Sequence, residues 1–166
     1  VSENVKTVLT IAGSDCSGGA GIQADLKTIT SWGVYGESVI TALTAQNTMG
    51  VADVLPIPPE FLEKQLECVF TDIVPDAVKI GMVTGIAQMQ VIRECLLKYQ
   101  AQHVVIDTVM VSTSGRYLME PDACDYYKEN ILPLAEVYTP NLPEAEVLLK
   151  TSIKTRKERV AAVREF

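Results

Sequence analysis

Short apolar runs alternate along this chain with segments of helical character, and this alternation limits the folds open to it. Extended segments are predicted at residues 8–11, 38–43, 52–57, 77–80, 104–106 and 137–139, and helices at residues 22–32, 60–70, 88–99, 121–130, 143–149 and 157–166. Strands that alternate with helices form βα units, which build a mainly parallel sheet with right-handed crossovers. The predicted fold is a single α/β domain over residues 1–166, with helices on both faces of its sheet.

The composition is that of a folded domain with an acidic surface. Of the 166 residues 48% are hydrophobic, and the formal net charge is −7. This charge argues against nucleic acids and anionic membranes as partners, because both select basic surfaces. No apolar stretch approaches the eighteen or so residues of a membrane span. The four cysteines lack C-x-x-C spacing, which favours a cytoplasmic protein with free thiols, and Cys68 and Cys95 are predicted to be buried.

The densest group of glycines follows the first predicted strand, where residues 13–25 read GSDCSGGAGIQAD. Strand, glycine-rich loop and helix start follow one another here, which is expected to leave backbone N–H groups free for an anion or a polar small molecule. The block is not a P-loop, because Gly19 stands where that motif needs lysine. A dinucleotide fingerprint is formally present at Gly19, Gly21 and Ala24, but it begins too far beyond the strand to turn a pyrophosphate onto the helix.

Several conspicuous residues directly follow, or come within two residues of, the ends of predicted strands. They are Gly13, Gly81, Met82, Asp107 and Asn141. In parallel α/β sheets, ligands bind beyond the carboxyl ends of the strands. We therefore expect these residues to lie along one edge of the sheet, at a binding site.

Six stretches of the chain carry a family resemblance. They are TIAGSD at 10–15, SGGAGIQADLK at 17–27, ALTAQNT at 42–48, KIGM at 79–82, VIDTVM at 105–110 and TPNLPEA at 139–145. Together they closely resemble the hydroxymethylpyrimidine/phosphomethylpyrimidine kinases of thiamine biosynthesis. The resemblance implies a ribokinase-like fold, ATP with Mg²⁺, and phosphorylation of 4-amino-5-hydroxymethyl-2-methylpyrimidine and then of its monophosphate. Relatives of this family accept pyridoxal-type substrates, and a homodimer is plausible.

The resemblance implies a substrate pocket made of Gly13, Asp25, Gln46, Met82 and Val109. The carboxamide of Gln46 can donate to a ring nitrogen of the aminopyrimidine and accept from its exocyclic amine. Without the resemblance, Gln46 is interpreted as a surface glutamine on a turn. Met82 and Val109 would pack on the ring faces, or else belong to the core. Gly13 would let the ring approach the backbone, and Asp25 would hold the hydroxymethyl group unless it only complements the helix dipole.

The phosphate side of the site is expected at a second helix start. By the resemblance, Asn141 and Glu144 contact ATP, and Glu144 and Asp107 contribute to Mg²⁺ binding. From the residues alone, a capping box formed by Asn141 and Glu144 is the favoured interpretation, and the resemblance reverses that preference. Lys79 either neutralises phosphate charge or forms a salt bridge.

Family members continue well past the position that corresponds to Phe166. By the resemblance, that part carries a second glycine-rich segment, the residue that activates the attacking hydroxyl, and most of the adenine pocket. We therefore expect a sheet that is incomplete at the C-terminus with an exposed strand edge, and a chain that does not turn over by itself. The alternatives are a pyridoxine or pyridoxal kinase of the same fold and a non-catalytic pyrimidine-binding module.

Overall fold

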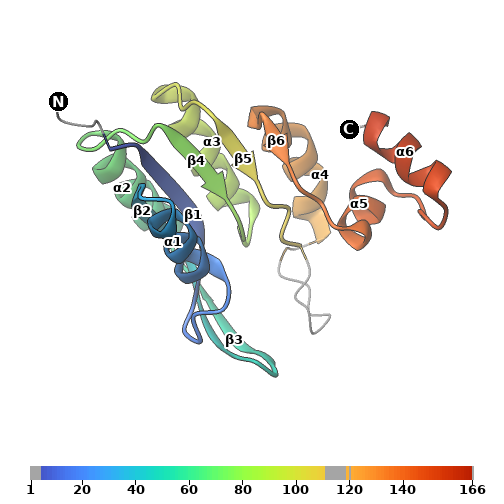
Figure 1. Ribbon diagram of the computed structural model, residues 1–166, viewed down its shortest axis with the longest axis horizontal. Helices are drawn as coiled ribbons and strands as arrows, with labels where there is room; N and C mark the ends of the chain where they lie inside the picture. Colours follow the sequence, from blue (N-terminus) through green and yellow to red (C-terminus); the bar gives the residue numbers. More distant parts are fainter. Residues whose placement is uncertain (1–4, 111–118, 120, 166) are drawn as a thin grey trace.

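The protein is described by a computed structural model over residues 5–110, 119 and 121–165, where a six-stranded sheet forms its centre (Figure 1). The strands are β1 (Thr7–Asp15), β2 (Tyr35–Asn47), β3 (Gly50–Pro56), β4 (Ala77–Ile80), β5 (Val104–Ile106) and β6 (Val137–Tyr138). Their order is β3-β2-β1-β4-β5-β6, and all neighbours are parallel except β2 and β3. The prediction of a mainly parallel sheet is confirmed.

Helices lie on both faces of the sheet, as predicted (Figure 1). Helix α1 (Gly21–Ser31) packs on one face against β1 and β2. On the opposite face lie α2 (Pro59–Phe70), α3 (Ile86–Lys98) and α4 (Pro121–Asn130). A 3₁₀ turn, η1 (Leu132–Leu134), leads into β6, and α5 (Leu142–Leu149) and α6 (Arg156–Glu165) follow it.

The main core fills the space between the sheet and α2, α3 and α4. Alternate residues of β1 and β4 supply its floor, which consists of Leu9, Ile11, Val78 and Ile80. Because strand side chains alternate between faces, the intervening Thr10 and Lys79 point to the side of α1. This alternation brings polar side chains to the α1 side of the sheet.

The face of the sheet opposite the core is only partly covered by the described residues. Val105 of β5 and Val137 of β6 are paired in register, and they are 36% and 52% exposed. Although helices lie on both faces of the sheet as predicted, they leave this pair of valines partly exposed. Among the described elements, the main contacts of α1 are with β1 and β2, at the other side of the sheet from this pair.

Two differences from the sequence-based expectations concern β2 and Cys68. Strand β2 is longer than predicted, because its first part pairs with β1 and its last part pairs with β3. Cys68 is exposed and only Cys95 is buried. Helix α2 buries Leu62, Leu66 and Phe70, each four residues apart, so that Cys68 falls on its outward side.

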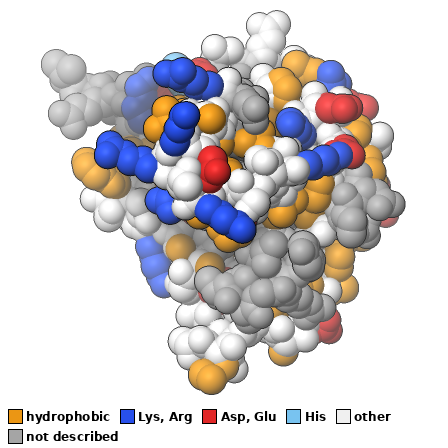
Figure 2. Space-filling model, turned by 90° about the vertical axis from the view of Figure 1, so that its right-hand side faces the viewer, with side chains coloured by type: hydrophobic (Ala, Val, Ile, Leu, Met, Phe, Trp, Pro, Cys, Tyr) orange, Lys and Arg blue, Asp and Glu red, His pale blue; other side chains and the backbone are white. Residues whose placement is uncertain are grey.

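The far end of the molecule is formed by α5 and α6. Figure 2 views this end and shows Lys and Arg side chains gathered around hydrophobic ones. Val160 and Val163 of α6 are exposed there. The net negative charge is thus unevenly distributed over the surface.

Within the described residues, no helix combines the length and apolar character that crossing a membrane requires.

Candidate functional site

A cavity of about 530 Å³ lies at the carboxyl ends of β1, β2 and β4, beside the start of α1. All five residues expected to contact substrate line it, together with one expected metal contact: Gly13, Asp25, Gln46, Met82, Val109 and Asp107. The structure thus brings together residues that are as far as 96 positions apart, from Gly13 to Val109. The geometry follows from the parallel sheet, whose strands all deliver their carboxyl ends to the same edge.

The glycine-rich loop beside this cavity is folded around the carboxylate of Asp15. The backbone N–H groups of Ser17 and Ala20 donate to it at 2.8 Å and that of Gly19 at 3.0 Å. The Ser17 hydroxyl adds a further hydrogen bond at 2.8 Å. The expectation that these N–H groups are free for a ligand anion is therefore wrong, because Asp15, only 3% exposed, already occupies the cradle.

The electrostatics of Asp15 reflect this enclosure. Burial raises the pKa of its carboxyl, but the hydrogen bonds from Ser17, Ala20 and Gly19 more than offset that effect and hold the pKa below its ordinary value. Sequence reasoning missed this residue. A signal was available, because an aspartate at the start of a glycine-rich loop is typical of an Asx turn, in which its side chain accepts from the backbone N–H two residues on.

Gln46 is presented to the cavity by an irregular part of the β2–β3 hairpin. The register of the two strands shifts between Ala45 and Gln46, as it does in a β-bulge, which turns a side chain in a new direction. The Cys16 thiol donates to the Gln46 carbonyl at 3.1 Å and accepts from its N–H at 3.3 Å. Thr44 donates to the side-chain oxygen of Gln46 at 3.2 Å. Both the glycine-rich loop and the hairpin therefore hold Gln46 in position.

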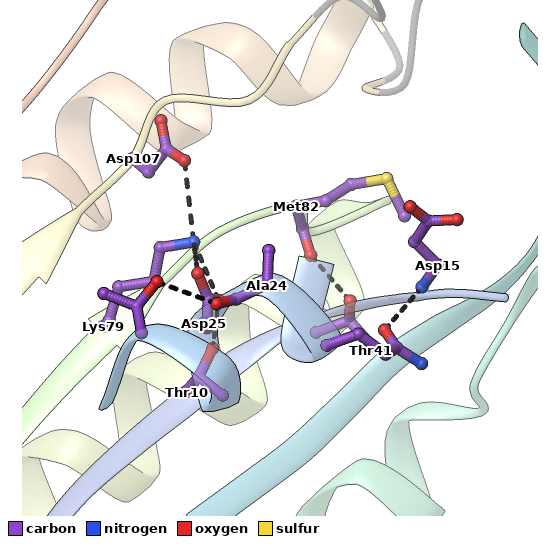
Figure 3. Close-up of polar contacts among 10 residues, drawn as sticks. Thr10, Asp15, Ala24, Asp25, Thr41, Lys79, Met82 and Asp107 are labelled. Atoms are coloured by element: carbon purple, nitrogen blue, oxygen red, sulfur yellow. Dashed lines mark hydrogen bonds and ion pairs between the residues drawn. The ribbon is translucent and has the colours of Figure 1, made fainter. Parts of the chain in front are cut away.

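Met82 and Gly13 are matched in shape. A Cβ atom at Gly13 would lie 2.6 Å from the Met82 methyl carbon, so a larger residue there would require the flexible end of Met82 to move. The Met82 carbonyl accepts a hydrogen bond of 2.6 Å from Thr41, and Figure 3 shows this contact. The space beside Gly13 is therefore taken by the Met82 side chain, a contact that the sequence did not indicate.

Lys79, Asp25 and Asp107 form an ionic cluster in the cavity (Figure 3). The Lys79 ammonium lies 3.0 and 3.2 Å from the two carboxylate oxygens of Asp25 and 3.5 Å from Asp107. Thr10 donates to Asp25 at 2.6 Å. Of the two alternatives left open for Lys79, the structure shows the salt bridge. Asp25 is the closer of its two partners, and Asp25 is itself held by Thr10.

Asn141 and Glu144 do not line this cavity. They form the capping box at the start of α5, with the Asn141 side chain accepting from Glu144 N–H and the Glu144 carboxylate accepting from Asn141 N–H, both at 2.9 Å. Glu144 is 4% exposed, and its carboxylate also accepts from Thr108 at 3.0 Å and from Met110 N–H at 3.4 Å. Glu144 is thereby joined to the loop after β5 that carries Asp107 and Val109.

The fit of this region to Mg²⁺ follows from these contacts. In the described part of the chain no group of three or more His, Cys, Asp or Glu side chains is placed to hold a metal ion. Glu144 is largely used by its own hydrogen bonds, whereas Asp107 is half-exposed. Asp107 therefore suits a water ligand of a hydrated magnesium ion, which usually keeps several of its waters, and Glu144 adjoins that position through the loop after β5.

The fold is that of the ribokinase-like class of α/β proteins. The sequence profile of the phosphomethylpyrimidine kinase family matches residues 15–166, and the chain belongs to that family.

The relatives it resembles are small-molecule kinases. The hydroxymethylpyrimidine/phosphomethylpyrimidine kinase of Escherichia coli K12 is 52% identical over 141 residues, which are 85% of this chain and 53% of that protein. The crystal structure of phosphomethylpyrimidine kinase from Clostridium difficile 630 is 49% identical, with a TM-score of 0.89 over 96% of this chain and 69% of that one. Pyridoxal kinase from Staphylococcus aureus in complex with pyridoxal is 37% identical, with a TM-score of 0.86 over 96% of this chain and 60% of that one.

The chain is shorter than these relatives. It spans 53% of the Escherichia coli protein and 33% of the Geobacter sulfurreducens thiamine biosynthesis bifunctional protein ThiED, to which it is 48% identical.

Proposed function

We propose that this chain carries the pyrimidine-binding part of an ATP-dependent hydroxymethylpyrimidine/phosphomethylpyrimidine kinase of thiamine biosynthesis. The observation that carries the proposal is the single cavity lined by Gly13, Asp25, Gln46, Met82 and Val109. Its substrates are 4-amino-5-hydroxymethyl-2-methylpyrimidine and the monophosphate of this alcohol. The proposal places the protein in the cytoplasm and includes the homodimer that the resemblance makes plausible.

The ring is recognised at its polar edge and on its faces. An aminopyrimidine offers an acceptor nitrogen beside an amine donor, and one carboxamide can satisfy both. The Cys16 thiol and the bulge hold the backbone of Gln46, so that its carboxamide can serve this purpose at little entropic cost. Met82 supplies a polarizable contact to one ring face and Val109 a contact to the other.

The reacting end of the substrate lies, in this proposal, at the ionic cluster. Asp25 accepts a hydrogen bond from the hydroxymethyl group, and Thr10 and Lys79 keep its carboxylate in place. ATP, when bound, supplies the phosphoryl group, and Mg²⁺ offsets its charge. Asp107 and Glu144 would hold the water ligands of the ion, and Asn141 would contact phosphate oxygens. The described residues include none to which we assign the role of general base.

Calorimetric titration with the hydroxymethylpyrimidine tests the binding half of the proposal. The wild-type chain is expected to bind it, and Gln46→Ala is expected to weaken binding by about 1–3 kcal/mol, because the polar edge of the ring then has no partner. Gln90→Ala is the matched control, since Gln90 is an exposed residue of α3. Absence of binding to the wild-type chain would overturn the proposal, as would equal losses in the two variants.

Mass spectrometry after incubation with Mg-ATP and the same alcohol tests turnover. The proposal expects no phosphorylated product from the 166-residue chain and product from the Escherichia coli relative, assayed in parallel. Product from the 166-residue chain, with its intact mass verified in the same run, would show that no further segment is needed. A longer form of the protein that binds the alcohol but never phosphorylates it would support a non-catalytic binding module.

A pyridoxal-type substrate is the second candidate, supported by the likeness to the Staphylococcus aureus pyridoxal kinase–pyridoxal complex. Pyridoxal lacks the exocyclic amine that the Gln46 carboxamide would pair with. The proposed function therefore expects the aminopyrimidine to bind at least about tenfold more tightly than pyridoxal, the size of one lost hydrogen bond. The opposite order in a competition titration would favour the pyridoxal kinase.

A further inference from the structure

The cavity carries a marked imbalance of charge. Its lining includes the carboxylates of Asp15, Asp25 and Asp107, whereas Lys79 is the one basic side chain among the described lining residues. The Asp15 carboxylate is enclosed by its own loop. A phosphomonoester would add roughly −1.5 to −2 charges to this site at neutral pH. An anionic ligand is therefore repelled here unless it contacts Lys79.

The position of Lys79 is built into the fold. Lys79 extends from β4 toward the side of the sheet that holds α1, where Asp25 receives it. A Cβ atom at Gly81 would lie 2.9 Å from the Lys79 ammonium nitrogen and 3.0 Å from Ala12, so the missing side chain at Gly81 makes room for the ammonium group. The ends of β1 and β4 and the helix α1 thus determine where the Lys79 ammonium group lies.

The two ionic contacts of Lys79 differ in strength. Asp25 contacts it through both oxygens, at 3.0 and 3.2 Å, and is itself held by Thr10. Asp107 lies at 3.5 Å, longer than the roughly 2.7–2.9 Å of a strong charge-assisted hydrogen bond, and its side chain is half-exposed. One of the three N–H donors of Lys79 can therefore turn from Asp107 to a ligand while Asp25 still anchors the amine.

We propose that Lys79 is the residue that recognises the phosphorylated form of the substrate, its ammonium group exchanging Asp107 for a phosphate oxygen of the bound phosphomonoester. This inference rests on the proposed function and assigns separate roles in substrate recognition to Gln46 and Lys79. Gln46 selects the ring in both substrates, and Lys79 discriminates the anionic substrate from the neutral alcohol.

The test compares the alcohol with its monophosphate, titrated separately into the 166-residue chain without nucleotide. For Lys79→Met we expect affinity for the monophosphate to fall by at least about tenfold more than affinity for the alcohol, the size of one desolvated ionic contact. Lys79→Arg should keep most of the monophosphate affinity. Lys6→Met is the matched control, because Lys6 pairs with Asp76 and lies outside this cavity, and it should change neither affinity.

A double variant separates direct contact from net charge. Lys79→Met with Asp107→Asn removes one positive and one negative group, and so leaves the net charge of the cavity unchanged. If Lys79 contacts the phosphate, the monophosphate affinity stays low in this variant. Recovery of that affinity would overturn the inference, as would equal losses for the two ligands in Lys79→Met.

The wild-type chain provides a test that needs no variant. Added salt should weaken binding of the monophosphate and leave binding of the alcohol nearly unchanged, because only the former depends on an ionic contact. Equal salt dependence would count against Lys79 even if Lys79→Met failed to fold. Failure of the wild-type chain to bind either ligand would instead overturn the proposed function, and the inference with it.

Discussion

Asp15 organises the loop that borders the cavity by offering four N–H and O–H donors a common acceptor. The donors are the N–H groups of Ser17, Gly19 and Ala20 and the hydroxyl of Ser17. The same loop carries Cys16, which contacts the backbone of Gln46. A buried carboxylate therefore shapes part of the site without itself being assigned to the substrate.

Replacing Asp15 by asparagine tests this role. The amide group of Asn turns N–H donors toward the N–H groups of Gly19 and Ala20, so we expect a loss of roughly 2–3 kcal/mol in the free energy of unfolding. Urea denaturation at neutral pH measures it. Asp125→Asn is the control, because the contact of Asp125 within the described residues is an exposed ion pair with Lys150, and about 1 kcal/mol or less is expected there. Equal losses in both variants would contradict a special role for Asp15.

The pH dependence of the same comparison has a definite sign. The pKa of Asp15 is lower in the folded protein than its ordinary value of 3.8, so the folded state gains stability from the ionised carboxyl above that pH. This contribution is lost as the pH falls below 3.8 toward the folded pKa. The difference in unfolding free energy between the wild type and Asp15→Asn should therefore be constant near neutrality and shrink in acid. A difference that grew on acidification would exclude this explanation.

At the scale of elements, α1 is bounded at both ends by glycines of positive φ that serve different purposes. Gly33, with φ of +71°, follows the helix, and the N–H groups of Gly33 and Val34 bond to the carbonyls of Thr30 and Ile29, as in a Schellman motif. Gly21, with φ of +56°, begins the helix beside the carbonyl of Gly13. The start of α1 is therefore packed against the end of β1, whereas the C-terminal end of α1 has free space beside Gly33.

Alanine substitutions at these two glycines separate backbone strain from steric conflict. Both variants acquire the cost of a left-handed alanine, about 1–2 kcal/mol. Gly33→Ala should show only this cost, because no atom beyond the local chain lies within 4 Å of the added methyl group. Gly21→Ala should lose more unfolding free energy and also bind the pyrimidine more weakly, because the methyl group would collide with the Gly13 carbonyl. Equal stability of the two variants in urea would contradict the packing described for the start of α1.

The elements show where sequence-based prediction succeeded and where it could not. The strands over 77–80 and 104–106 and the helix over 121–130 have the predicted bounds, because apolar runs and proline positions are local signals. The extent of β2 was not predictable from hydrophobicity, since its polar end is set by pairing with β3.

The candidate site shows the same division. The carboxyl-end rule predicted that Gly13, Met82 and Asp107 lie together. The choice of Asp25 as the main partner of Lys79 depends on side-chain geometry between distant elements, which no local pattern encodes.

At the scale of the whole molecule, the sheet is covered unevenly. The face toward α2, α3 and α4 is buried, whereas Val105 and Val137 on the other face are exposed and β6 lies at the edge of the sheet. Exposed apolar side chains beside the edge of a sheet favour association with another chain. The predicted exposed strand edge therefore has a physical consequence for the behaviour of the chain in solution.

Substitution of the two exposed valines by threonine tests this consequence. Threonine keeps the β-branched shape that suits a strand while making the face polar, so Val105→Thr with Val137→Thr should shift the chain toward the monomer in sedimentation velocity. Its affinity for the pyrimidine should stay the same, because neither residue lines the cavity. Val74→Thr is the control, since Val74 is more exposed than either valine and lies in the loop before β4. A concentration-dependent association that the double variant leaves unchanged would place the contact elsewhere on the molecule.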